Sequence, residues 1–323
     1  MDHSISTLID SEFKKDVYQG LTAHPKFLLS KYIYDSQGDR LFQEIMKLPE
    51  YYLTNAEFEI FQRSKREICA LFEAEDGFDL IELGAGDGKK TKVLLQYLMD
   101  NGNNFSYKPI DISENAIQNL ESSLKNELPK LDVSAEIGSY FEVLDRLQKS
   151  NQRKKVILFL GSNIGNLLHP KAIEFLKGIG GCMNKDDLLF VGFDQKKDPQ
   201  TILDAYNDPA GVTAAFNKNL LSRINSELGG NFDLDHFKHW EVYDPESGTA
   251  KSYLVSTKQQ QVIIDELELI VDFEAWESIH TEISQKYDDR TIEWLAEQSG
   301  LRIETSFEDS NKLYRNYAFR STI

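Results

Sequence analysis

Cysteine is nearly absent from this chain, since Cys69 and Cys182 are its only two among 323 residues. Two thiols cannot form a disulfide framework, and they suit a reducing compartment. The sequence also lacks an apolar run long enough to cross a bilayer. Its first residues, MDHSISTLIDSEFKKD, have neither the basic region nor the apolar stretch of a secretory signal. We therefore expect a cytoplasmic protein with no membrane partner.

Positive charge is scarce as well. The chain has 36 Lys and Arg residues against 53 Asp and Glu residues, so its net charge is −17. No basic stripe reverses this locally, and we expect no nucleic-acid partner. His236 and His239 in LDHFKHW have helical spacing beside Asp235, but no cysteine or third histidine is near them in sequence. We expect no metal.

The composition that is present, 41% hydrophobic and 28% charged, is typical of a globular protein. Short apolar runs alternate with helix-length amphipathic stretches between residues 78 and 194. The runs are FDLIELG, YKPIDIS, DVSAEI, KVILFLG and DLLFVGFD. Strands separated in this way predict an α/β fold, a doubly wound, Rossmann-like parallel sheet with helices on both faces.

The flanking segments follow other patterns. Residues 1–60 are predicted to be mostly helical, and VTAAFNKNLLSRINSEL is a long helical stretch. AKSYLVSTK, QQVIID and LELIVDF alternate as antiparallel strands do. A last helix and two strands return to the edge of the first sheet. We predict one domain from residues 61–196 plus 287–323, and a second, α+β substrate-binding domain from residues 1–60 plus 197–286.

The turn after the first strand is rich in glycine. In ELGAGDGKK, Gly84, Gly86 and Gly88 allow a close backbone approach to a ligand, but Lys89 stands where a dinucleotide fingerprint has its third glycine. Asp111 ends the next strand, where its carboxylate can accept hydrogen bonds from a ribose diol. Capping of the following helix is the alternative role of Asp111. Together the features favour S-adenosylmethionine as cofactor over NAD.

The chain resembles the histidine-specific N-alpha-methyltransferases of the ergothioneine pathway, which convert histidine to its trimethylated betaine. The resemblance runs from Asp16 to Tyr287, well beyond the nucleotide-type core. It rests on YDSQGDRLFQEIMKLPEYY, ELGAGDGKKT, FLGSNIGNL, DAYNDPAGVTAAFNKNLLSRINSEL and VDFEAWESIHTEIS. The family has the two-domain fold predicted above.

The resemblance implies two sets of site residues. The cofactor contacts, including the second glycine of the turn, are Gly84, Gly86, Lys90, Asp111, Ser139 and Tyr140. For the amino-acid substrate, the resemblance implies that Asn166 and Tyr206 hold the amine and carboxylate, with Tyr34 beside the amine. It places Tyr51, Glu282 and Ser284 around the substrate ring. Tyr34, Asn166 and Tyr206 are therefore the expected catalytic positioning groups.

Taken on their own, these residues also have ordinary structural roles. Asn166 carries a donor and an acceptor, which suits an amino-acid ligand, but it could equally cap the helix that starts near Pro170. Each of the tyrosines could be a buried ring. Strand-like alternation in SIHTEISQKY puts Glu282 and Ser284 on one face, where they could hold a polar ring or form a solvated edge pair.

Two positions depart from the family pattern. Gly138-Ser139-Tyr140 replaces a Gly-Asp-Phe, so a hydroxyl stands where an adenine-contacting carboxylate is usual. Ser252 stands where the histidine enzymes tend to carry a methionine against the imidazole, and a smaller, polar residue there enlarges or wets the substrate pocket.

We predict transfer of methyl groups from S-adenosylmethionine to the α-amino nitrogen of L-histidine, three times, by a monomer. N-alpha-methylation of tyrosine or tryptophan is the alternative that Ser252 would permit. Two alternative hypotheses come from other functional classes: a nicotinamide-dependent oxidoreductase and a non-catalytic binding module.

Overall fold

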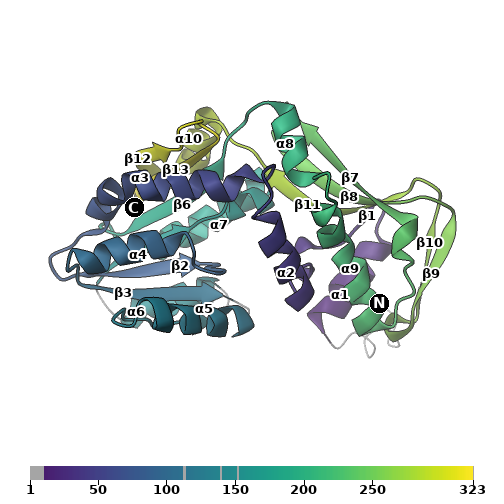
Figure 1. Cartoon of the computed structure of the whole chain (residues 1–323), viewed down its shortest axis with the longest axis horizontal. Helices are drawn as coiled ribbons and strands as arrows, with labels where there is room; N and C mark the ends of the chain where they lie inside the picture. The colour runs from purple at the N-terminus through teal and green to yellow at the C-terminus, as the bar shows by residue number, and fades with distance from the viewer. Residues whose placement is uncertain (1–10, 112–113, 139, 151–152, 323) are drawn as a thin grey trace. The chain divides into compact units, whose positions relative to one another are not determined.

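The computed structural model describes residues 11–111, 114–138, 140–150 and 153–322, and the chain divides into two compact units (Figure 1). The first comprises Met1–Tyr52 with Lys197–Ser284, and the second comprises Leu53–Lys196 with Gln285–Ile323. The predicted boundaries after residues 60 and 286 fall later in the chain than these divisions. The predicted boundary after residue 60 lies inside helix α3 (Tyr52–Phe72).

In the described part of the second unit, a seven-stranded sheet has the order β12-β13-β6-β5-β2-β3-β4. The strands are β2 (Phe78–Leu83), β3 (Phe105–Asp111), β4 (Glu136–Ile137), β5 (Lys154–Phe159), β6 (Leu188–Asp194), β12 (Leu301–Glu308) and β13 (Tyr314–Ser321). Strands β2 to β6 pair in parallel, and β13 is antiparallel to both of its neighbours. The predicted parallel sheet and the return of two C-terminal strands to its edge are confirmed.

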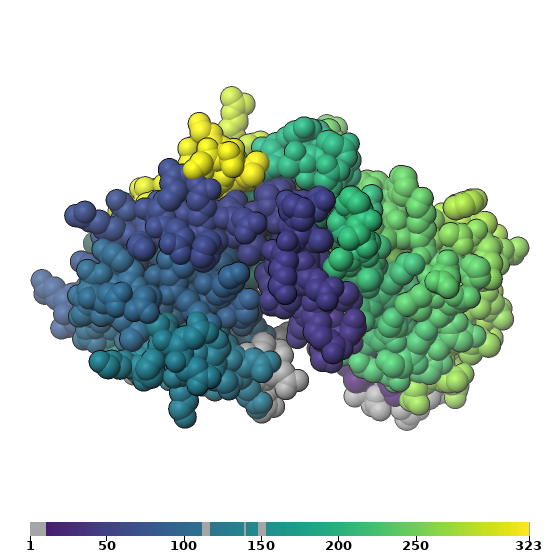
Figure 2. Space-filling model, in the orientation of Figure 1, coloured from purple at the N-terminus to yellow at the C-terminus, as the bar shows by residue number. Residues whose placement is uncertain are grey.

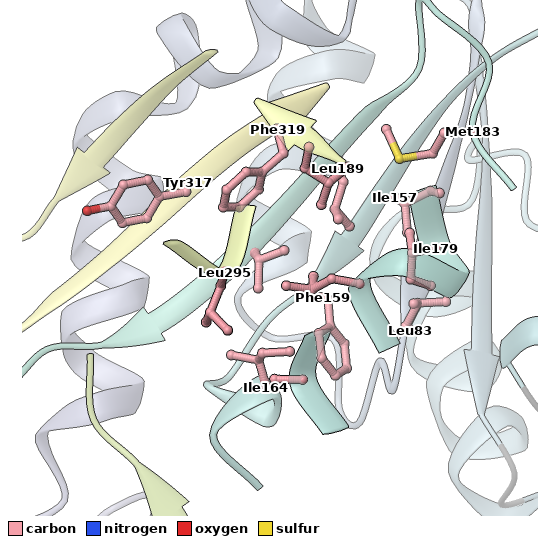
Figure 3. Close-up of a cluster of buried hydrophobic side chains, with 14 of the residues drawn as sticks. Leu83, Ile157, Phe159, Ile164, Ile179, Met183, Leu189, Leu295, Tyr317 and Phe319 are labelled. Atoms are coloured by element: carbon pink, nitrogen blue, oxygen red, sulfur yellow. The ribbon is translucent and has the colours of Figure 1, made fainter. Parts of the chain in front are cut away.

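Helices cover both faces of this sheet. They are α3, α4 (Thr91–Asp100), α5 (Glu114–Glu127), α6 (Tyr140–Ser150), α7 (His169–Gly181) and α10 (Asp289–Gln298). Buried side chains of α6, α7 and α10 pack on one face, where Phe159, Ile164 and Leu295 lie in one apolar cluster (Figure 3). On the other face, Phe72 of α3 packs against Phe190, with ring centroids 6.2 Å apart. The central strands are therefore buried from both sides, as their continuous apolar sequences predict.

The predicted strand DVSAEI is much shorter in the structure. Only β4 pairs as a strand, joining Ile110 to Glu136 and Asp111 to Ile137, and a separate bridge links Val133 to Tyr107. The segment lies at the edge of the sheet and has a neighbour on one side only, which limits how much of it pairs.

In the described part of the first unit, a four-stranded sheet has the order β1-β11-β8-β7, and β9 pairs with β10 in a hairpin. The strands are β1 (Lys26–Phe27), β7 (Phe237–Asp244), β8 (Thr249–Ser256), β9 (Gln260–Ile264), β10 (Leu269–Phe273) and β11 (Ser278–Gln285). The helices are α1 (Glu12–Thr22), α2 (Ser36–Ile45), α8 (Pro199–Tyr206) and α9 (Val212–Leu228). Short 3₁₀ turns lie at η1 (Ser30–Tyr32), η3 (Leu234–His236) and η4 (Asp265–Leu267). The N-terminal segment packs against the part of the chain after residue 197, seen as purple against green in Figure 2.

The helical spacing assigned to His236 and His239 is wrong. His236 ends η3, and His239 lies in strand β7, where every second side chain faces the core. The alternation in FKHWEVYD decides this, because Phe237, His239 and Glu241 are all buried. No helix among the described residues is long and apolar enough to cross a membrane.

Candidate functional site

The glycine turn, residues 84–90, follows the buried strand β2. Gly84, Gly86 and Gly88 have φ values of 71°, 55° and 63°, in the left-handed region that other residues avoid. A Cβ atom on Gly84 would lie 2.8 Å from the hydroxyl of Tyr140, while a Cβ on Gly86 would meet no atom within 4 Å. The turn therefore places bare backbone beside Tyr140 at Gly84 and next to open space at Gly86.

Asp111 and Tyr140, like this turn, lie at the carboxyl ends of the parallel strands. Asp111 is the last residue of β3, and its carbonyl accepts a hydrogen bond of 3.2 Å from the N–H of Gly138. Burial raises the pKa of Tyr140 to about 12, and the nearby Asp111 carboxylate adds to that rise. Three of the predicted cofactor residues, Gly84, Asp111 and Tyr140, are thus brought together. Ser139 lies outside the described residues.

Lys90 stands just before α4, and its ammonium group forms an ion pair with the carboxylate of Glu57. The same Glu57 oxygen, Oε2, accepts a hydrogen bond of 2.9 Å from the N–H of Gly161. Glu57 is fully buried in α3 and was missed by the sequence analysis. A signal existed, because Glu57 lies in the apolar stripe of α3 formed by Ala56, Ile60 and their neighbours.

Glu82 lies beneath the glycine turn. Its carboxylate accepts a 2.7 Å hydrogen bond from the Thr91 hydroxyl and another from the Tyr107 hydroxyl, and it is buried. Desolvation raises the pKa of Glu82 to about 7, although these hydrogen bonds and the charge of Lys90 act in the opposite direction. Glu82 therefore joins β2 to α4 and β3.

Asn166 ends the 3₁₀ turn η2 (Asn163–Asn166), directly after β5, and is exposed. Helix α7 has Leu168 at its N-cap and no side-chain cap hydrogen bond, so Asn166 does not cap that helix. Asn163, which the sequence analysis missed, brings its Nδ2 to 3.4 Å from the position of a Cβ on Gly84. The loop after β5 thus carries one polar side chain, that of Asn163, near the glycine turn.

In the first unit, the predicted residues Tyr34, Tyr51 and Tyr206 belong to one aromatic cluster. Phe42 joins Tyr34 to Tyr51, with ring centroids 5.8 and 6.2 Å away. Phe216 lies 5.4 Å from Tyr34, and Tyr206 lies 6.3 Å from Tyr51. Phe42 and Phe216 were not predicted, because nothing in the sequence shows that α2 and α9 pack against each other.

Tyr206 is held at both its backbone and its hydroxyl. Its carbonyl lies 2.9 Å from Nε2 of the buried His239, which must carry its proton on Nε2 to donate there. Its hydroxyl lies 2.8 Å from Oγ of Ser284, which is also buried. Two of the predicted substrate residues, one on α8 and one on β11, are therefore in direct contact.

Glu282 acts electrostatically on the aromatic cluster. The pKa of Tyr34 is raised well above its ordinary value, first by desolvation and then by the charge of Glu282, with smaller contributions from Tyr51 and Tyr206. Tyr34 as a whole residue retains 40% exposure. The hydroxyl of Tyr34 therefore stays protonated at neutral pH.

Ser252 is buried and has a partner that the sequence analysis missed. Its Oγ donates a 2.7 Å hydrogen bond to Oε2 of Glu241, the residue opposite it in the β7–β8 ladder. The hydroxyl of Thr281 on β11 lies 3.1 Å from the Ser252 carbonyl oxygen. The position that was expected to be merely smaller and more polar thus contains a hydroxyl–carboxylate pair. The strand alternation that places His239 inward would have placed Glu241 inward too.

The two sets of residues have different chemistry. The second unit offers open backbone at Gly86 and a carboxylate at Asp111, which fit an adenosine with its ribose diol. The first unit offers aromatic walls, hydroxyls at Tyr206 and Ser284, and the charge of Glu282, which fit a small zwitterion with a polar ring.

Comparisons with known proteins agree with this chemistry. A family model described as "Histidine-specific methyltransferase, SAM-dependent" matches residues 13–321. The chain is 36% identical to "Histidine N-alpha-methyltransferase" of Mycobacterium tuberculosis over 86% of this chain and 85% of that protein. It is also 36% identical to the protein of the same name in Mycolicibacterium smegmatis, over 90% and 88% of the two chains. "Ergothioneine biosynthesis protein 1" of Schizosaccharomyces pombe is 29% identical over 90% of this chain but only 38% of its own length.

Proposed function

The chain belongs to the family of histidine-specific, S-adenosylmethionine-dependent methyltransferases, and from this premise we propose that it methylates the α-amino nitrogen of L-histidine three times. The product would be the trimethyl betaine, hercynine. The proposal is supported by the names of the similar proteins and by the residues gathered around Tyr206 and Glu282.

We assign the cofactor to the glycine turn and its neighbours. Backbone at Gly84 and Gly86 would lie against the cofactor, and the Asp111 carboxylate would accept hydrogen bonds from the ribose hydroxyls. The Tyr140 hydroxyl, the Lys90 ammonium and Ser139 complete the set. When bound, S-adenosylmethionine supplies a methyl group on a positively charged sulfur.

We assign the amino acid to the aromatic cluster and β11. Glu282 would accept an N–H of the imidazole, and Ser284 would face its other nitrogen. The hydroxyls of Tyr206 and Ser284 lie 2.8 Å apart, so a ligand held by one of them would lie close to the other as well. Tyr51 would wall the ring, and Asn166 with Tyr206 would hold the carboxylate and amine.

The protonation state of the Tyr34 hydroxyl limits its role in catalysis. Because its pKa is raised well above the ordinary value, Tyr34 is a neutral hydroxyl that can accept from or donate to the amine, and it is not a tyrosinate base. A free α-amine must lose a proton before it can attack a methyl group. Burial and a nearby positive charge both favour that loss, so the proton can leave to water. Positioning of the nitrogen is then the main catalytic task of Tyr34, Asn166 and Tyr206.

The observation that carries the proposal is the convergence of Tyr34, Tyr51, Tyr206, Glu282 and Ser284, which are drawn together from distant parts of the chain. The test has two parts. Mass spectrometry of a reaction with S-adenosylmethionine and L-histidine should show one, two and then three added methyl groups. Calorimetry with S-adenosylhomocysteine present should rank L-histidine first among histidine, tyrosine, tryptophan and phenylalanine.

Other outcomes identify the alternatives. Tighter binding and faster methylation of tyrosine or tryptophan would establish the aromatic substrate that Ser252 was expected to permit. Binding of S-adenosylhomocysteine without methyl transfer to any amino acid would indicate a binding module.

We also propose that the protein is a cytoplasmic monomer. The free thiols Cys69 and Cys182 are consistent with a reducing compartment, and light scattering should give a mass near 37.1 kDa.

A further inference from the structure

Glu57 ties together several segments around the glycine turn, in a way that no part of the reaction described above uses. Its Oε2 forms an ion pair with the Lys90 ammonium and accepts a hydrogen bond from the Gly161 N–H. Its Oε1 accepts a 2.9 Å hydrogen bond from Nδ2 of Asn316. The partners come from the glycine turn, the loop after β5 and strand β13. Both oxygens of this fully buried carboxylate are therefore engaged.

The fold makes room for Glu57 at a glycine. A Cβ atom on Gly192 of β6 would collide with Oε1 of Glu57 and with the hydroxyl of Tyr314. Asn316, which bonds Glu57, is the partner of Gly192 in the β6–β13 ladder. Desolvation, followed by the charges of Glu57 and Asp194, raises the pKa of Tyr314 well above its ordinary value. The Glu57 carboxylate thus occupies the space that the absence of a side chain at Gly192 leaves beside the sheet.

Lys90 is the member of this group that reaches the turn itself. Its side chain retains 20% exposure, whereas Glu57 has none. Its Nζ lies 3.4 Å from the position of a Cβ on Gly161, which has a left-handed φ of 71°. An ammonium group has three donors, so Lys90 can bind Glu57 and a second anionic group at the same time. A buried carboxylate is retained at low cost only where a partner of opposite charge is fixed beside it.

We propose that Glu57 is a positioning residue that aims the Lys90 ammonium at the carboxylate of the methionine portion of the cofactor. That carboxylate is the single anionic group of S-adenosylmethionine, so it is the group that a fixed ammonium would recognise. Glu57 also fixes the Gly161 N–H, and with it the start of the loop that carries Asn163 and Asn166. This inference rests on the cofactor site proposed above.

The test compares two ligands with the Glu57→Gln variant. S-adenosylhomocysteine carries the amino-acid portion, and 5′-deoxy-5′-methylthioadenosine has the same adenosine and thioether without it. Calorimetry should show that Glu57→Gln weakens S-adenosylhomocysteine binding about tenfold or more, the value of one lost charged hydrogen bond. Binding of methylthioadenosine should change less than about twofold. Glu59→Gln, in the same helix but at a partly exposed position bonded to Ser310, is the matched control and should affect neither ligand.

Equal loss of both ligands, or no loss of either, would overturn the inference. A Lys90→Met variant and the double variant add a second criterion, because a residue that acts through Lys90 can cost nothing more once Lys90 is gone. Greater loss in the double variant than in Lys90→Met would contradict this path. If Glu57→Gln does not fold, an unchanged ratio of the two affinities in Lys90→Met would by itself refute the inference. Failure of the unmodified protein to bind S-adenosylhomocysteine would instead remove the proposed function.

Discussion

Replacement of Glu82 by glutamine should change how the stability of the protein depends on pH. The buried Glu82 carboxyl has a pKa of about 7 in the folded chain, against an ordinary value of 4.5. A group whose pKa is raised by folding holds more protons in the folded state than in the unfolded state between these two values. Its stabilising contribution is therefore fully present below about pH 4.5 and is lost as the pH rises through about 7.

The size of the effect follows from the two pKa values. At 1.36 kcal/mol for each pKa unit, about 2 to 3 kcal/mol of the contribution disappears between about pH 5 and about pH 8. The glutamine side chain of the Glu82→Gln variant does not titrate, and it imitates the protonated carboxyl. Its oxygen can accept from Thr91 while its N–H₂ donates to the Tyr107 oxygen. The free energy of unfolding of the variant should therefore rise relative to that of the unmodified protein by roughly 2 to 3 kcal/mol over this pH range.

Urea unfolding at several pH values between about 5 and 8 measures the difference directly. Glu59→Gln is the control, because the pKa of Glu59 is lowered, chiefly by hydrogen bonds from Ser310 and Arg63. A lowered pKa gives stability that is lost only as the pH falls below about 4.5, so this control should stay parallel to the unmodified protein. A constant gap between Glu82→Gln and the unmodified protein would refute the reasoning, because Glu82 would then be ionised throughout.

Four further substitutions test the proposed sites. Glu282→Ala should raise the KM for histidine about tenfold or more while S-adenosylhomocysteine binds as before, and equal loss of both would make Glu282 structural. Asn166→Ala should lower kcat about tenfold for every amino acid tested, and a normal rate would remove Asn166 from the amine site. Ser252→Ala should reduce the free energy of unfolding by about 2 kcal/mol, because the buried Glu241 loses a donor, and unchanged urea unfolding would contradict that bond. Gly192→Ala should cost about 2 kcal/mol or more in the same assay through its collision with the Glu57 carboxylate, and a neutral result would mean that the sheet yields there.

Local patterns predicted most of the secondary structure. The apolar runs FDLIELG and DLLFVGFD became β2 and β6, and VTAAFNKNLLSRINSEL became α9 over Val212–Leu228. Such segments are decided by periodicity within one element, which the sequence displays directly. The errors came where neighbours decide. DVSAEI has a pairing partner on one side only, and the helical spacing of His236 and His239 competed with the strand alternation of the same residues.

Sequence reasoning named the residues expected to touch ligands but missed those that hold them in place. Phe42 bridges Tyr34 and Tyr51, and Phe216 packs against Tyr34, yet the two phenylalanines lie on α2 and α9, far apart in the chain. The apolar stripe of α3 indicates that Glu57 is buried, but its partners Lys90, Gly161 and Asn316 are brought to it only by the fold. These contacts depend on tertiary packing, and no periodicity in one segment encodes them.

Three glutamates at core-facing positions show what such contacts do to a carboxylate. Glu57 has a fixed ammonium beside it, Glu82 has two neutral hydroxyls, and Glu241 has the Ser252 hydroxyl. Hydrogen bonds from neutral hydroxyls offset only part of the free-energy cost of desolvating a carboxylate. The pKa of Glu82 therefore rises to about 7 in spite of two such hydrogen bonds. An ammonium offsets more of it, but it must then be held where the carboxylate is. A charged residue in an apolar stripe therefore points to its partner, and at Glu57 that partner is Lys90, the lysine of the glycine turn.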